Sequence, residues 1–182
     1  LTGLGAILIV WAIFTYNRLV ALKNEARNAW HQIDVQLKRR YDLIPNLVAV
    51  VKGYMEFEKT TLQSVTEARA KAMSAVRLSD RAIAENTLTQ SLGSLFAVIE
   101  NYPVLKSNES VMHLQEELVS TENRIAFARQ LYNDLVANFR TRLEVFPDNI
   151  IAATFAFETM EYFSADKSDR HVPVSDIGIR AK

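Results

Sequence analysis

The sequence predicts an all-α protein, in which an N-terminal transmembrane helix continues into an antiparallel, up-and-down four-helix bundle with a short C-terminal helix and tail. Three observations lead to this fold class. The 182 residues include only five glycines and four prolines, and so few turn-forming residues favour long helices. Apolar residues recur with alternating spacings of three and four, which is typical of helices that pack on other helices. The chain also begins with an apolar run that carries no charge before Arg18.

Residues 1–17 are predicted to form a membrane anchor. At 1.5 Å per residue, the run up to Tyr16 spans roughly 24 Å, slightly less than the ~30 Å hydrocarbon core of a bilayer. Because the chain starts at Leu1 rather than at a methionine, we expect upstream residues to supply the remaining turn. Trp11 and Tyr16 are amphipathic rings of the kind found at membrane interfaces. The residues predicted to span the membrane are Leu4, Ile7, Leu8, Val10, Trp11, Ile13 and Phe14.

Two alternatives exist for this apolar run. It resembles a cleaved signal peptide in its position, but no small-x-small cleavage motif follows it. It could also be a buried core helix. The charges just beyond the run bear on orientation, because Arg18, Lys23 and Arg27 are opposed only by Glu25. The positive-inside rule therefore predicts that this flank lies in the cytoplasm.

Residues 18–163 are predicted to form the bundle. No proline occurs before Pro45, so the anchor helix is expected to continue to about Arg40. The next helix is expected to begin near Pro45, which a first turn tolerates, with Asp42 as its cap. Gly53 is expected inside this second helix, at a close helix crossing. The apolar positions of these two helices are Leu19, Leu22, Ala26, Ala29 and Ile33, then Leu47, Val50, Tyr54, Phe57, Thr61, Val65, Ala68 and Ala72.

Two further helices complete the predicted bundle. Residues 76–80 are a connection, and a third helix follows and ends at Pro103. The fourth helix is capped by Ser107 or Asn108 and stops at Pro147. Its apolar pattern alternates without a fault, at Val111, Leu114, Leu118, Thr121, Ile125, Ala128, Tyr132, Leu135 and Phe139. A short helix is expected within residues 148–163, and an extended tail within residues 164–182.

The sequence lacks the residue patterns of an enzyme. There is no cysteine, and none of the three histidines has a glutamate three residues before it, as a di-metal bundle site would require. We therefore predict no catalytic residue, no metal, no cofactor and no small-molecule substrate. A formal net charge of +0 gives no general reason to bind nucleic acid. Thr121, at a core position, has two interpretations: membership of a small polar network with Glu122 and Asn123, or a hydrogen bond to its own helix backbone.

One charged cluster is a candidate partner-binding site, formed by Lys38, Arg39, Arg40 and Asp42. The predicted corner between the first two helices would place it about 35 Å from the bilayer, beyond the ~8 Å Debye length, so lipid headgroups are not its main partner. Three cations at a helix C-terminus complement the helix dipole, and a structural corner suffices to explain them. The alternative hypothesis is that Lys38, Arg39 and Arg40 also dock an acidic partner or a second protomer.

Several long motifs resemble the bacterial LemA family. They include YNRLVALKNEARNAWHQIDVQLKRRYDLIPNLV from Tyr16, ENYPVLKSN from Glu100 and LQEELVSTENRIAFARQLYN from Leu114. Shorter matches are VKGY, ARAKA, FP and EYF, so the resemblance covers nearly the whole chain. Val104 stands where an aspartate is common, and Phe139-Arg140 replaces a usual aromatic-asparagine pair, which puts any role of that asparagine in doubt.

The resemblance implies a single N-terminal membrane anchor, a helical bundle on the cytoplasmic side and no known catalytic activity. Family members are often encoded beside membrane zinc metalloproteases of the HtpX type, which suggests a partner. The leading hypothesis is a membrane-anchored, non-catalytic scaffold that holds a protein partner or copies of itself. The alternative is a regulatory adaptor or accessory subunit of such a protease or another membrane complex. A hydrolase with an unrecognised site and a membrane-shaping protein are less consistent with the heptads and the even charge distribution.

Overall fold

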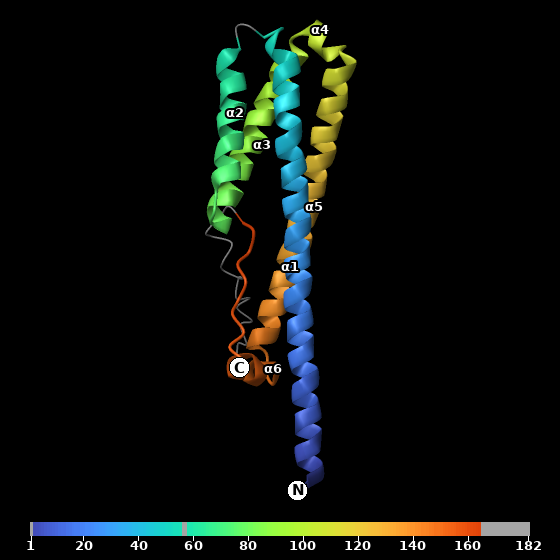
Figure 1. The fold of residues 1–182 in the computed structure, drawn as a ribbon, viewed down its shortest axis with the longest axis vertical. Helices are drawn as coiled ribbons and strands as arrows, with labels where there is room; N and C mark the ends of the chain where they lie inside the picture. The colour runs from blue at the N-terminus through green and yellow to red at the C-terminus, as the bar shows by residue number, and fades with distance from the viewer. Residues whose placement is uncertain (1, 56–57, 165–182) are drawn as a thin grey trace, which may run out of the picture.

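The structure is a computed structural model that describes residues 2–55 and 58–164, with only the backbone of Thr2 and Leu4. The described residues form helices and no strand, and one long helix carries the apolar N-terminal run, so the predicted all-α class is confirmed (Figure 1). The helices are α1 (Thr2–Lys52), α2 (Lys59–Ser74), α3 (Leu78–Glu100), α4 (Pro103–Lys106), α5 (Glu109–Glu144) and α6 (Asp148–Thr154).

Helix α1 is 51 residues long and passes through Pro45 without ending. The predicted corner between Arg40 and Pro45, with Asp42 as a cap, is therefore wrong. A proline inside a helix leaves the carbonyl four residues earlier without its usual N–H donor. Here that carbonyl belongs to Tyr41, and Arg69 of α2 donates its Nε–H to it at an N···O distance of 2.8 Å. The tertiary contact thus supplies the hydrogen bond that Pro45 removes, and the helix can continue.

The chain turns after α1 rather than at Pro45. Gly53 lies in this turn, and a Cβ at its position would have no atom beyond its chain neighbours within 4 Å, so the predicted close helix crossing at Gly53 is also wrong. Helices α2 and α3 then form a hairpin beside the half of α1 that is farther from the N-terminus (Figure 1). Helix α5 runs back along α1 toward the N-terminal end, where α6 follows. The long helices therefore alternate in direction.

The core follows most of the predicted heptad positions. On α1 the side chains of Leu19, Ala26, Ala29 and Ile33 are buried as predicted. Tyr54, also predicted at a core position, is 49% exposed because it lies in the turn after α1. The buried side chains of α3 include Leu88, Leu92, Leu95 and Ile99. Seven of the nine predicted positions on α5 are buried, namely Val111, Leu118, Thr121, Ile125, Ala128, Tyr132 and Phe139. Of the two predicted caps of α5, Ser107 and Asn108, the structure has Asn108, whose side chain accepts hydrogen bonds from the backbone N–H groups of Ser110 and Val111.

The chain after α6 extends the core. The short helix expected within residues 148–163 is α6, and the chain from Phe155 to Ser164 runs back along the bundle (Figure 1). Phe163 is buried with its ring centroid 5.5 Å from that of Trp30. The hydroxyl of Tyr132 donates to the carbonyl oxygen of Glu161 at 2.8 Å, and Phe163 N donates to Asn133 Oδ1 at 2.9 Å. The predicted tail beyond Ser164 lies outside the described residues.

Candidate functional site

The predicted cluster of Lys38, Arg39, Arg40 and Asp42 lies within α1 and not at a helix end. Its members differ in how far they are buried. Arg40 is 2% exposed, whereas Lys38, Arg39 and Asp42 are exposed. Arg39 forms an ion pair with Glu117 of α5. The structure therefore does not keep the three cations together as one free basic surface.

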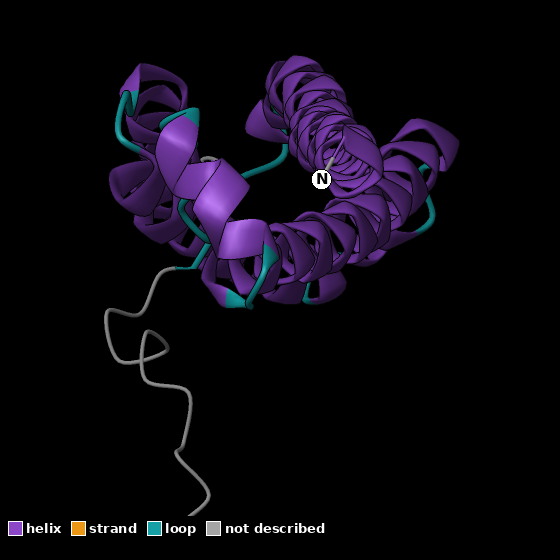
Figure 2. Ribbon diagram, turned by 90° about the horizontal axis from the view of Figure 1, so that it is seen from below, coloured by secondary structure: helices purple, strands orange, loops and turns teal. Residues whose placement is uncertain are grey.

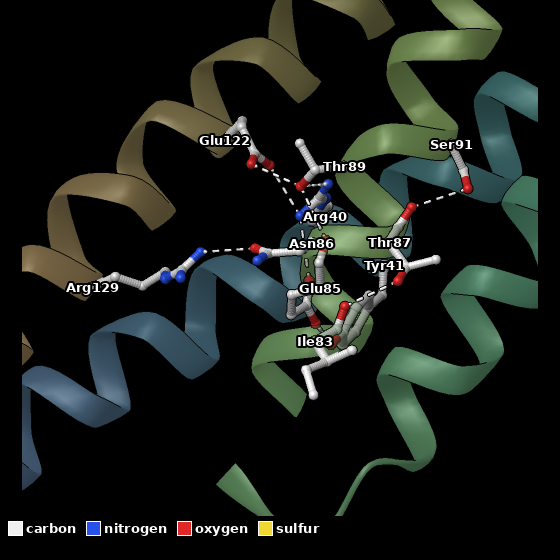
Figure 3. A network of polar contacts seen from close by, with 10 residues as sticks. All are labelled: Arg40, Tyr41, Ile83, Glu85, Asn86, Thr87, Thr89, Ser91, Glu122 and Arg129. Carbon is white, nitrogen blue, oxygen red and sulfur yellow. Dashed lines mark hydrogen bonds and ion pairs between the residues drawn. The ribbon is translucent and has the colours of Figure 1, made fainter. Parts of the chain in front are cut away.

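Arg40 lies at the centre of a polar network between three helices (Figure 3). Its Nη1 atom lies 3.3 Å from Glu85 Oε2 on α3 and 3.0 Å from Glu122 Oε2 on α5. Its Nη2 atom donates to Thr89 Oγ1 at 2.8 Å. The hydroxyl of Tyr41 donates to the other carboxylate oxygen of Glu85. One guanidinium thus links α1, α3 and α5.

Burial dominates the electrostatics of this network. Burial raises the pKa of the Glu85 carboxyl above its usual value, although the hydrogen bond from Tyr41 and the charge of Arg40 oppose the shift. Burial also raises the pKa of Tyr41 well above its usual range, and the hydrogen bond to Glu85 adds to that shift. The side chains of Arg40 and Glu85 are each only 2% exposed, so a substrate cannot reach them. We interpret the network as a structural link between helices.

Thr121 is explained by a simpler contact. Its Oγ1 donates to the backbone carbonyl of Glu117 at 2.7 Å, which is the expected bond of a buried threonine to its own helix. Glu122, beside it, belongs to the Arg40 network, whereas Asn123 is exposed. Of the two interpretations made for Thr121, the structure supports the backbone hydrogen bond.

A surface groove is the second notable site, and we call it the α1–α5 groove. It has a volume of about 1290 Å³ and is lined by α1, α3 and α5. Three apolar side chains in it are strongly exposed: Val35 by 63%, Val119 by 51% and Phe127 by 71%. Polar residues share its lining, among them Gln32, Glu116 and Arg124. Such an arrangement of exposed apolar groups among polar ones is typical of a protein-binding surface.

This groove was not predicted, although the sequence contains a signal for it. The heptad positions mark the buried side of each helix, and Val35, Val119 and Phe127 fall between them. Apolar residues outside the buried stripe were therefore the signal for a second, exposed apolar surface. No cluster of metal-ligating side chains occurs in residues 2–55 and 58–164. His31 and His113 are exposed there, and His171 lies outside the described residues.

The apolar end of α1 is the third feature. The best eighteen-residue window of the segment Gly5–Lys52 has a mean hydropathy of 1.7, which together with its length is enough for a membrane span. Only 11% of this window is buried, so it does not behave as a core helix of this domain. Trp11 is partly buried, and the side chain of Leu4 lies outside the described part. The other predicted membrane-spanning residues are exposed: Ile7, Leu8, Val10, Ile13 and Phe14.

Comparisons with known proteins agree with the motifs in the sequence. The model of the LemA family matches residues 29–176. Magnetosome protein MamQ of Magnetospirillum gryphiswaldense is 24% identical, in a match that covers 85% of this chain. Protein LemA of Metamycoplasma hominis is 26% identical over 156 residues, covering 85% of this chain and 71% of the relative. The chain spans 66% of the length of the MamQ relative.

Proposed function

This chain belongs to the LemA family, and from that premise we propose that it is a single-pass membrane protein whose helical domain binds another protein or a second copy of itself, without catalysing a reaction. In this proposal α1, α2, α3 and α5 act together as an antiparallel four-helix bundle. The domain stands on the cytoplasmic side of the inner membrane of a bacterial cell.

The membrane part of the proposal rests on the continuity of α1. The exposed apolar residues Ile7 to Phe14 lie on the same unbroken helix as the core residues Ala26, Ile33 and Leu37. An apolar surface of this size is unfavourable in water and favourable in hydrocarbon. The cations Arg18, Lys23 and Arg27 follow it at once, which supports the cytoplasmic orientation.

The binding part of the proposal is carried by one observation, the α1–α5 groove. Its apolar side chains are strongly exposed: Phe127 by 71%, Val119 by 51% and Val35 by 63%. Because these side chains lie outside the core, polar residues at the same positions would not disturb the packing of the core. Aromatic and aliphatic side chains contribute most to binding when a partner covers them and excludes water. Polar neighbours around such a patch are typical of the rim of an interface.

Native mass tests this function. The chain of 20.6 kDa would be extracted in mild detergent from its own membranes, and the protein mass of its complex would be determined by light scattering. We expect a mass above one chain. The double variant Phe127→Ser, Val119→Ser should reduce it to one chain without lowering the melting temperature. The matched control Ile83→Ser, Val104→Ser removes two exposed apolar side chains outside the groove and should leave the complex intact.

The composition of the complex separates two forms of the proposal. Several copies of this chain alone would support a scaffold that assembles with itself. A stoichiometric second protein would support an adaptor or accessory subunit, for example of an HtpX-type membrane protease. A lone wild-type chain, or a groove variant that assembles like the control, would contradict the proposal.

Lys38 and Asp42 remain a second candidate contact for a partner. Both are exposed on one face of α1, four residues apart, where opposite charges also attract each other on any solvated helix. Lys38→Glu should lower the mass of the complex without changing the melting temperature if an acidic partner docks there. An unchanged mass would assign the two residues to the solvated surface.

A further inference from the structure

The end of the domain that faces the N-terminal part of α1 carries a second group of exposed apolar residues. Val145, Phe146, Ile150 and Phe155 are exposed by 45%, 74%, 51% and 57%, and we call them the α6 patch. They lie around α6, on the chain from the end of α5 to the first residue after α6. The patch is separate from the α1–α5 groove, because the two share no residue.

Helix α6 packs directly on α1. Ile151 and Ala152 are buried against Leu19, and Trp11 and Ala12 are packed against the same small core. The ring centroid of Tyr16 lies 4.8 Å from that of Phe155 and 5.7 Å from that of Phe157. The contacts therefore fix α6 beside residues 11–19 of α1, where the apolar run gives way to charged residues.

The orientation of α6 differs from that of the long helices α1, α2, α3 and α5. It lies across the end of the domain in Figures 1 and 2, and beyond it only α1 continues in the described part of the chain. Its inward residues are Ile151 and Ala152, and its outward side carries Ile150, Ala153 and Thr154, none of them charged. The hydroxyl of Thr154 donates to the backbone carbonyl of Ile150, so the outward face is uncharged and largely apolar. A helix with one face packed on its domain and such a face outward is suited to lie in a membrane interface.

We propose that the α6 patch inserts into the interfacial layer of the bilayer beside the transmembrane part of α1, as a second contact between the domain and lipid. This inference rests on the proposed membrane anchor. The occupant is lipid because the patch is continuous with the apolar surface of α1 and lies at its cytoplasmic end. When Tyr16 lies at the membrane surface, Phe155 in contact with it lies there as well. The domain is then held at two points, which limits its tilt.

Site-specific fluorescence can test this inference on the full chain. The sequence has no cysteine, so a single cysteine can be labelled without removing any native one. Ile150→Cys and Phe146→Cys report on the α6 patch. Phe14→Cys is the reference for the membrane span, and Val104→Cys, 63% exposed on α4 at the far end, is the reference for water. Each variant is labelled with an environment-sensitive dye and reconstituted into vesicles of phosphatidylcholine and phosphatidylglycerol.

Two quenchers then locate each dye, a doxyl-labelled lipid and aqueous iodide. We expect the dyes at positions 146 and 150 to be quenched by the lipid several-fold more than the dye at position 104, with shallower doxyl positions most effective. If the lipid quenches the dye at position 14 but iodide quenches the dyes at 146 and 150, the α6 patch lies in water. That result would overturn the inference and would still support the proposed anchor. Protection of 146 and 150 from both quenchers would mean that protein covers the patch, which also overturns it. Iodide quenching at position 14 would instead refute the proposed anchor, and the inference with it. Unchanged circular dichroism melts would show that all four variants are folded.

Discussion

Replacement of Arg40 by methionine should be among the most destabilising single changes in the domain. Methionine matches the length of the arginine stem but leaves Glu85 without its ion-pair partner. Glu85 is 1% exposed, and without Arg40 its carboxylate still accepts the hydrogen bond from Tyr41 and still feels the charge of Arg81. Removal of one partner from a buried ion pair costs about 3–5 kcal/mol, because the remaining charge is buried without compensation.

The magnitude can be converted to a melting temperature. For a chain of this size, each kcal/mol lowers the melting temperature by about 2–4 °C, so Arg40→Met should lower it by about 6–20 °C. The result should move toward the lower end of that interval as the pH falls. Burial already raises the pKa of Glu85, so without Arg40 this carboxyl can bind a proton and lose its charge. The penalty should therefore shrink as the pH falls.

The assay is thermal unfolding of the full chain in mild detergent, followed by circular dichroism from pH 5 to pH 8. Arg39→Met is the matched control, because Arg39 is the next residue and its ion pair with Glu117 lies at the surface. Surface pairs contribute about 0–1 kcal/mol, so the control should shift the melting temperature by only a few degrees. Equal shifts in the two variants, or a penalty in Arg40→Met that grows toward low pH, would refute the reasoning.

Three further predictions concern stability. Since burial raises the pKa of Glu85, the native state holds the proton on this carboxyl more tightly than the unfolded chain does. The resulting stabilisation is complete below the unfolded pKa of about 4.3 and is lost as the pH rises through the native pKa. Glu85→Gln removes the titrating group, so the melting temperature of the variant should depend less on pH in that window. Arg69→Met should cost about 1–3 kcal/mol in denaturant unfolding, because the Tyr41 carbonyl loses its donor. Pro45→Ala should abolish most of that cost by supplying a backbone N–H, and additive effects in the double variant would contradict this account. Tyr132→Phe should cost about 0.5–1.5 kcal/mol and speed amide exchange at Phe163, and unchanged exchange there would show that the hydroxyl is dispensable.

The sequence predicted the buried stripes well because they depend on local periodicity. Ala26, Ala29 and Ile33 on α1 and Ile125 and Ala128 on α5 are buried as the heptads require. The cap at Asn108 was predictable for the same reason, since capping involves a side chain and the backbone two or three residues later. These features need no knowledge of how distant segments meet.

The errors arose where distant residues decide the outcome. Pro45 resembles a helix start in sequence, and its tolerance inside α1 depends on Arg69 on another helix. Arg40 was grouped with its neighbours Lys38 and Arg39, but its partner Glu85 lies 45 residues away in sequence. A run of cations does not reveal which member is buried. The ring contact of Phe155, directly after α6, with Tyr16 likewise joins segments that are far apart in the sequence, and no local pattern indicated it.

The unbroken path of α1 has a geometric consequence for any partner. Nineteen residues separate Tyr16 from Val35 on one helix, which corresponds to a rise of about 29 Å and a net rotation of about 100°. Because α1 is unbroken between these two points, the number of residues sets the angular position of the α1–α5 groove around the helix axis and, for the proposed membrane anchor, its height above the bilayer. A partner that is itself embedded in the membrane would have to present its contact surface at the same height and at the matching angular position around α1.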